Sequence, residues 1–146
     1  MTTSANVPLR LWLLFVAALL PSPNAFGQIP DLAKSHIEAN VPEPKNFRAF
    51  LVRDLTTHLK RRFGDGIAVD YEMLREGATQ SGVAYPKFYL WVTVTKADNA
   101  KVEAAARVAA IEKKEFEVTN FLTREEIAAK PTSIEGVFPQ LLDPKI

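Results

Sequence analysis

The sequence contains no cysteine, and only two histidines and two methionines stand among its 146 residues. Without cysteine the chain can form no disulfide and offers no thiolate as a metal ligand or nucleophile, and the lipoprotein route, which needs a cysteine at the cleavage point, is excluded. His36 and Glu38 have neither the spacing nor the further ligands of a metal site. We therefore predict no metal and no cofactor, and a fold that depends on its hydrophobic core alone.

A single long apolar run is present, at residues 11–20, and it lies near the start of the chain. Arg10 precedes the run, and the small-residue tripeptide Ala25-Phe26-Gly27 follows it, which is the order of a secretory signal peptide. Ten residues form a helix of only about 15 Å, half of the roughly 30 Å that a membrane span must cross. We expect cleavage between Gly27 and Gln28, export to the periplasm or the medium, and no membrane span afterwards.

Charge is balanced in the expected mature chain. Cleavage after residue 27 of 146 leaves 119 residues, and the loss of Arg10 leaves 17 basic against 17 acidic side chains. A neutral chain of this length suits one domain and argues against a nucleic-acid binder. Within it we expect a lead at residues 28–43, with a short helix that Asp31 caps and that runs toward Asn40, and a single α+β domain at residues 44–146.

The clearest periodic pattern follows Pro44 and ends before Gly64-Asp65-Gly66. Large apolar residues recur there at helical spacing: Phe47, Phe50, Leu51, Leu55, Leu59 and Phe63. Such a stripe forms one face of a helix. We predict that this is the main core helix and that its apolar face lies on a sheet.

Period-two patterns predict that sheet. In residues 67–74, the apolar residues Ile67, Val69, Tyr71 and Met73 stand at every second position. Residues 85–96 place Phe88, Leu90, Val92 and Val94 on one side of a strand, and aromatic and threonine side chains on the other. Residues 116–121 have the character of a further strand. Because both sides of the 85–96 strand are partly apolar, we expect its second face to be covered as well.

Residues 101–111 are ambiguous. Their alanine-rich sequence has high helix propensity, yet Val102, Ala104, Ala106, Val108 and Ala110 also alternate with other residues. We favour a strand, because a helix there would leave the preceding aromatic strand without an antiparallel neighbour.

The C-terminal part is expected to be helical. Residues 123–126 read as a capping box that starts a short helix, which Pro131 ends. The apolar residues Ile134, Val137, Phe138, Leu141 and Leu142 keep helical spacing, although Pro139 interrupts them. We expect two helical turns there, packed onto the sheet edge.

The predicted fold class is thus α+β, with one long core helix packed on a curved antiparallel sheet of about four strands and short terminal helices. This order, from Pro44 to Phe121, resembles that of the cystatin-like and nuclear-transport-factor-like folds, in which a curved sheet wraps a long helix. The cystatin protease-binding signature Gln-x-Val-x-Gly is not met, because residues 80–84 read Gln-Ser-Gly-Val-Ala. The resemblance implies a fold and no particular activity.

Few residues could carry catalysis. His58 lies beside the core face of the predicted helix and could act as a proton carrier with Asp70 or Glu72 of the first strand. Such an arrangement would suit a small cofactor-free isomerase or hydrolase with a cone-shaped cavity between helix and sheet. A half-covered histidine on a helix flank is the commoner explanation.

Two groups of residues could carry binding. Basic side chains mark the outer face and the end of the core helix: Arg48, Arg53, Lys60, Arg61 and Arg62. Aromatic side chains mark the second face of the 85–96 strand: Tyr85, Tyr89 and Trp91. The basic cluster could bind a phosphate or sulfate group, an anionic lipid surface or an acidic partner. The aromatic residues could stack on a sugar ring or anchor a protein interface. A solvated helix face and a second small core are the commoner explanations of the two groups.

The sequence therefore predicts an exported, soluble binding or interaction module rather than an enzyme. Its ligand, an unknown small molecule or protein, would bind the aromatic sheet face or a cavity between helix and sheet. A homodimer is one arrangement that would present the aromatic face.

Overall fold

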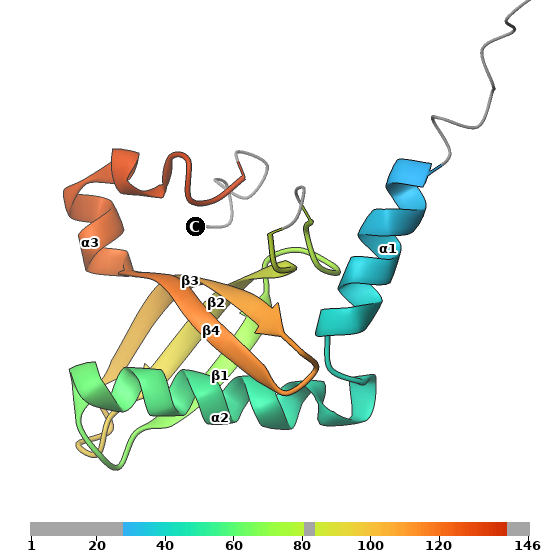
Figure 1. Cartoon of the computed structure of the whole chain (residues 1–146). Helices are drawn as coiled ribbons and strands as arrows, with labels where there is room; N and C mark the ends of the chain where they lie inside the picture. The colour runs from blue at the N-terminus through green and yellow to red at the C-terminus, as the bar shows by residue number, and fades with distance from the viewer. Residues whose placement is uncertain (1–27, 81–83, 140–146) are drawn as a thin grey trace, which may run out of the picture.

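The structure is a computed structural model, and it describes residues 28–80 and 84–139. Its elements along the chain are α1 (Gln28–Asn40), α2 (Pro44–Phe63), β1 (Ala68–Met73), β2 (Lys87–Thr95), β3 (Lys101–Ile111), β4 (Glu115–Thr123), α3 (Arg124–Ala129) and the 3₁₀ helix η1 (Pro131–Ile134). The strands form one antiparallel sheet in the order β1-β2-β3-β4 (Figure 1). The predicted α+β class with a four-stranded antiparallel sheet is confirmed. The predicted signal peptide, residues 1–27, lies outside the described residues.

Residues 101–111 form strand β3, as we favoured. This strand pairs with β2 on one side and with β4 on the other. The alanines at 104–106 and 109–110 are buried between the two covered faces of the sheet. Tertiary packing on both faces thus overrides the high helix propensity of this segment, because small side chains fit a central strand that is covered twice.

The main hydrophobic core lies between α2 and the sheet (Figure 1). Leu51, Leu55 and Leu59 of α2 are fully buried there. They pack with the inward-facing residues of β2, which are Phe88, Leu90, Val92 and Val94 as the alternation predicts. Helix α2 thereby covers one face of the sheet, and its flanking side chains come to lie along the sheet edges.

The second face of the sheet is covered by the C-terminal elements. Tyr89 and Ala105 form a smaller core there with Ile127 and Phe138, and Trp91 packs against it. The capping box that begins α3 is confirmed: the hydroxyl of Thr123 accepts from the backbone N–H of Glu126, whose carboxylate accepts from the Thr123 N–H. This interaction fixes the angle at which the chain leaves β4 and turns back over the sheet.

Two terminal predictions need correction. Helix α1 is already formed at Gln28, so Asp31 lies inside the helix and not at its cap. The C-terminal apolar residues pack on the face of the sheet rather than its edge, since Phe138 contacts Tyr89 of the inner strand β2 at 5.9 Å between ring centres. Leu141 and Leu142 lie outside the described residues.

Helix α1 projects from the body of the molecule and is held at its C-terminal end (Figure 1). The buried side chain of Asn40 accepts a hydrogen bond from the backbone N–H of Glu112, and its backbone carbonyl accepts from the N–H of Lys113. These bonds tie α1 to the turn between β3 and β4. Over residues 28–80 and 84–139, no helix has both the length and the apolar character needed to cross a membrane.

Candidate functional site

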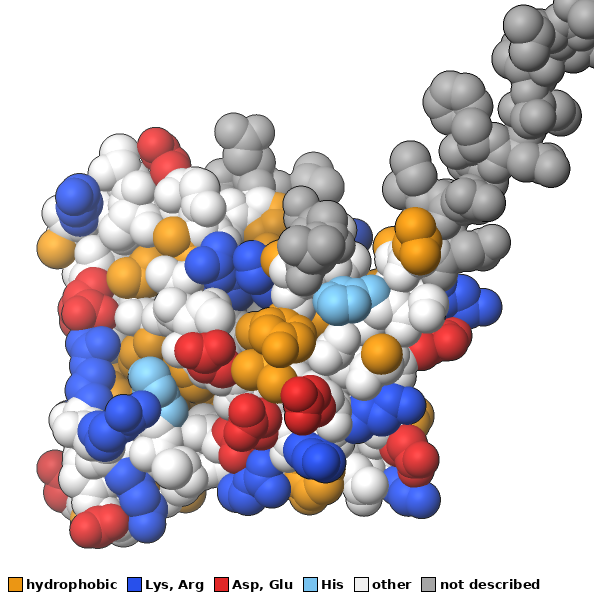
Figure 2. Space-filling view, viewed as in Figure 1, with side chains coloured by type: hydrophobic (Ala, Val, Ile, Leu, Met, Phe, Trp, Pro, Cys, Tyr) orange, Lys and Arg blue, Asp and Glu red, His pale blue; other side chains and the backbone are white. Residues whose placement is uncertain are grey.

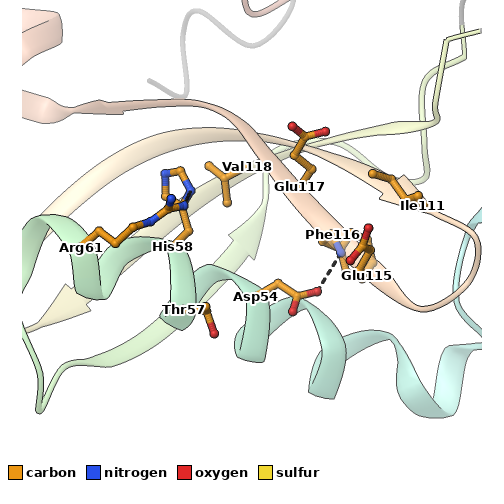
Figure 3. A pocket seen from close by; sticks show the side chains of 9 residues that line it. All are labelled: Asp54, Thr57, His58, Arg61, Ile111, Glu115, Phe116, Glu117 and Val118. Atoms are coloured by element: carbon orange, nitrogen blue, oxygen red, sulfur yellow. Dashed lines mark hydrogen bonds between the residues drawn. The ribbon is translucent and has the colours of Figure 1, made fainter.

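A groove of about 490 Å³ runs between α2 and the edge strand β4. Its α2 side is formed by Asp54, Thr57, His58 and Arg61, and its other side by Ile111 and residues 115–118 (Figure 3). Figure 2 shows that basic and acidic side chains are mixed over this part of the surface. The groove has the size of a small-molecule or peptide site and is lined by both polar and apolar groups.

One end of the groove is basic and holds two of the residues that the sequence singled out. Nη2 of Arg61 lies 3.1 Å from Nδ1 of His58. Because a guanidinium only donates, Nδ1 must accept this bond and the imidazole proton must be on Nε2. Burial, with the positive charge of Arg61, lowers the pKa of His58. The histidine is therefore a neutral donor beside a charged guanidinium.

The other end of the groove carries the carboxylates of Asp54 and Glu115. One carboxylate oxygen of Asp54 accepts from the backbone N–H of Phe116 at 2.7 Å, and the other accepts from Nε of Arg53 at 2.7 Å. Glu115 stands beside Phe116 in Figure 3, whereas Glu117 points away from α2. The groove is thus charged differently at its two ends.

Backbone groups of β4 also line the groove. In an antiparallel pair, successive residues direct their N–H and C=O groups alternately toward and away from the partner strand. The N–H of Phe116 bonds to Asp54 and so points away from β3. Val118 lies two residues after Phe116, and the register of β4 against β3 shifts only beyond it. Val118 therefore also directs its N–H and C=O away from β3. Over the described residues no strand pairs with this edge of β4, and such an edge can pair with another extended chain.

Most of the predicted basic cluster is neutralised by ion pairs. The pairs join Arg48 to Asp70 at 3.0 Å, Arg53 to Asp54 at 2.7 Å, Lys60 to Asp65 at 3.3 Å and Arg62 to Glu126 at 2.8 Å. Among the five cations, and over the described part of the chain, Arg61 is left without a carboxylate partner. The cluster is therefore largely the solvated helix face that was the commoner explanation, with one unbalanced charge in the groove.

The structure does not bring His58 together with Asp70 or Glu72. Val69, Tyr71 and Met73 pack against the α2 core, whereas the alternate residues Asp70 and Glu72 are exposed, and Arg48 of α2 pairs with Asp70. A hydrogen bond from the Tyr71 backbone, with one from Arg48, lowers the pKa of Asp70. The predicted catalytic pairing is not formed, because His58 lies beside the edge strand β4, whereas Asp70 and Glu72 are on β1 at the opposite edge of the sheet.

The aromatic residues do not form one open stripe. Tyr89 is only 7% exposed, and Trp91 is half-buried with the guanidinium of Arg124 lying 5.1 Å above its ring. Tyr85 is exposed and stacks against His36 of α1, with 6.4 Å between ring centres. The prediction of an aromatic binding face is therefore corrected: Tyr89 and Trp91 belong to the second core under the terminal segments, which was the commoner explanation.

A second groove, of about 440 Å³, is almost entirely apolar. It lies between α1, the start of α2 and the loop after β1, and it is lined by Ile37, Val41, Pro42, Pro44, Phe47, Gly77, Ala78 and Phe88. Sequence reasoning missed it, because its walls come from segments whose approach depends on how α1 attaches. No group of three or more metal-ligating side chains occurs over residues 28–80 and 84–139.

No family model, no curated protein and no solved structure matches this chain. The resemblance to the cystatin-like and nuclear-transport-factor-like folds therefore stays a prediction. The geometry of the grooves carries the functional argument.

Proposed function

We propose that this protein is an exported binding module that holds its ligand in the groove between α2 and β4. The observation that carries the proposal is the unbalanced guanidinium of Arg61, which lies in a groove beside a neutral histidine donor and a free strand edge. Binding sites combine an apolar surface with a few polar groups that fix orientation. In this groove Phe116 and Val118 supply apolar surface, and Arg61 and His58 supply the polar groups at one end.

The chemistry of the groove favours binding over catalysis. A general base needs a free lone pair within reach of its substrate. Nδ1 of His58 already accepts from Arg61, and its Nε2 carries the proton. Both carboxylate oxygens of Asp54 are engaged as acceptors. His58 and Asp54 are thus held by partners in a way that suits binding more than proton transfer.

The architecture and location belong to the same proposal. A helix that buries three leucines against a four-stranded antiparallel meander supports a cystatin-like or nuclear-transport-factor-like fold, with α2 as the long core helix and a curved sheet. The charged and apolar pattern of residues 10–27 supports a secretory signal and export to the periplasm or the medium. A small molecule and a protein segment are both compatible with the size of the groove.

Native mass spectrometry of the protein, purified gently from the exported fraction, tests this proposal. We expect the wild-type chain to begin at Gln28 and to carry a bound species that the Arg61→Ala variant loses. Lys60→Ala is the matched control, because Lys60 is the neighbouring cation, pairs with Asp65 and does not line the groove. Retention of the bound species by Arg61→Ala would contradict the proposed site, and an uncleaved chain would contradict export.

A further inference from the structure

The basic end of the groove offers hydrogen-bond donors in excess of acceptors. Arg61 has one guanidinium N–H group directed at His58 and no carboxylate partner over the described residues. The side chain of His58, on α2, and Val118, on β4, line the same groove (Figure 3), so the Nε2–H of His58 and the outward N–H of Val118 are further donors there. A planar guanidinium with neighbouring N–H donors matches a carboxylate, whose two oxygens accept several such bonds.

The strand edge adds a requirement on the rest of the ligand. The backbone carbonyl of Phe116 and the backbone N–H of Val118 both point away from β3. If a strand were added at this edge, both groups would face one and the same residue of it. If the added strand runs parallel to β4, one of its residues donates its N–H to the carbonyl of Phe116, and the carbonyl of the same residue accepts from the N–H of Val118. If that residue is the last of its chain, its carboxylate replaces the carbonyl and also reaches the cation.

The charge along the groove agrees with this direction. A chain that runs parallel to β4 and ends at Arg61 would first pass the end where Asp54 and Glu115 lie. The N–H of Phe116 is already bonded to Asp54, so the pairing is confined to the last residue of the added chain. Because Arg53 pairs with Asp54, the carboxylate that a basic side chain two or three residues before the terminus would face is that of Glu115, and a multiply charged anion would meet its repulsion.

We propose that the α2–β4 groove binds the free C-terminal carboxylate of an extended peptide, which lies parallel to β4 with its last residue opposite Glu117. Arg61 and His58 hold the carboxylate, and the backbone of Phe116 and Val118 holds the last peptide unit. This inference rests on the proposed binding function of the same groove and names the chemistry of the ligand.

Amide NMR of the purified ¹⁵N-labelled protein tests the proposal. The probes are acetyl-Lys-Ala-Val with a free carboxylate, the same tripeptide as its carboxamide, and sodium acetate. We expect the free tripeptide to shift the Val118 amide signal and to bind about tenfold or more tightly than the carboxamide, because hydrogen bonds to a charged group are the strong ones. Acetate should bind more weakly than the free tripeptide, since it lacks the peptide N–H.

Three results would overturn the proposal. They are an equal response to the carboxamide, an equal affinity for acetate, which would mean a site for small carboxylates only, and no shift at Val118 with any probe. Arg61→Ala should lose at least about tenfold in tripeptide affinity while Lys60→Ala stays unchanged, and Arg61→Lys should recover part of the loss. Dispersed amide spectra of each variant show that it is folded. An Arg61-dependent species in native mass spectrometry, without a carboxylate response in NMR, would refute this inference and leave the proposed function standing.

Discussion

Asp54 holds the groove together, and its replacement gives the sharpest test of the structure. Its carboxylate side chain is only 16% exposed and joins α2 to the backbone N–H of Phe116, which lies 62 residues away in the chain. In Asp54→Ala this part-buried N–H loses its acceptor, which costs about 1–3 kcal/mol. The ion pair with the more exposed Arg53 adds little, because water screens such pairs.

Urea unfolding of the wild type and the variant measures this cost. With an m-value of about 2 kcal/mol/M, the midpoint should fall by about 0.5–1.5 M. Asp54→Asn should lose less, because its amide oxygen can still accept from the Phe116 N–H. Asp65→Ala is the matched control, since that carboxylate also pairs with a basic residue of α2 but is 93% exposed, and its midpoint should stay close to that of the wild type.

An unchanged midpoint for Asp54→Ala would refute the reasoning. It would mean that the Phe116 N–H finds water or another acceptor at no cost, and that the edge of β4 is not fixed by α2. Equal losses for the alanine and asparagine variants would instead assign the effect to charge and not to the hydrogen bond.

Two further predictions concern the core and the response to acid. Leu55→Ala should destabilise the fold by about 2–5 kcal/mol in urea unfolding, because Leu55 is fully buried, whereas Leu32→Ala on exposed α1 should change little, and similar losses would contradict the assigned core. The backbone hydrogen bond from Thr123, together with Arg62, lowers the pKa of Glu126, so this carboxylate contributes stability above its unfolded pKa and loses it as the pH falls through the folded value. Unfolding measured from pH 7 to pH 3 should show a smaller acid-induced loss in Glu126→Gln than in the wild type, and identical slopes would count against the interaction.

Local patterns predicted most of the fold because each depends on a few neighbouring residues. The helical stripe of α2, the alternation along β2 and the capping box at Thr123 all appear where the sequence places them. The segment 101–111 needed a non-local argument, since its alanines suit helix and strand alike. The requirement that β2 have a second neighbour decided it correctly.

The site was predicted only in part. His58 and Arg61 do line the groove, but the sequence paired His58 with carboxylates of β1, which lies at the opposite edge of the sheet. Asp54 gave no signal at all, because its function depends on Phe116, which is remote in sequence. The sequence does not show that Tyr89 and Trp91 are covered, because the residues that cover them, Ile127 of α3 and Phe138, lie far along the chain.

The sequence by itself determined which side chains face inward along α2 and β2, because periodicity is a property of the local backbone. Other features depend on segments that come together from distant parts of the chain. These are the pairing of the charges, the covering of the aromatic residues and the open strand edge. Only the tertiary structure decided them. The unbalanced charge of Arg61 is of this kind, since it stands out only once the four neighbouring cations of α2 have found their carboxylates on the loop after α2 and on β1, α2 and α3.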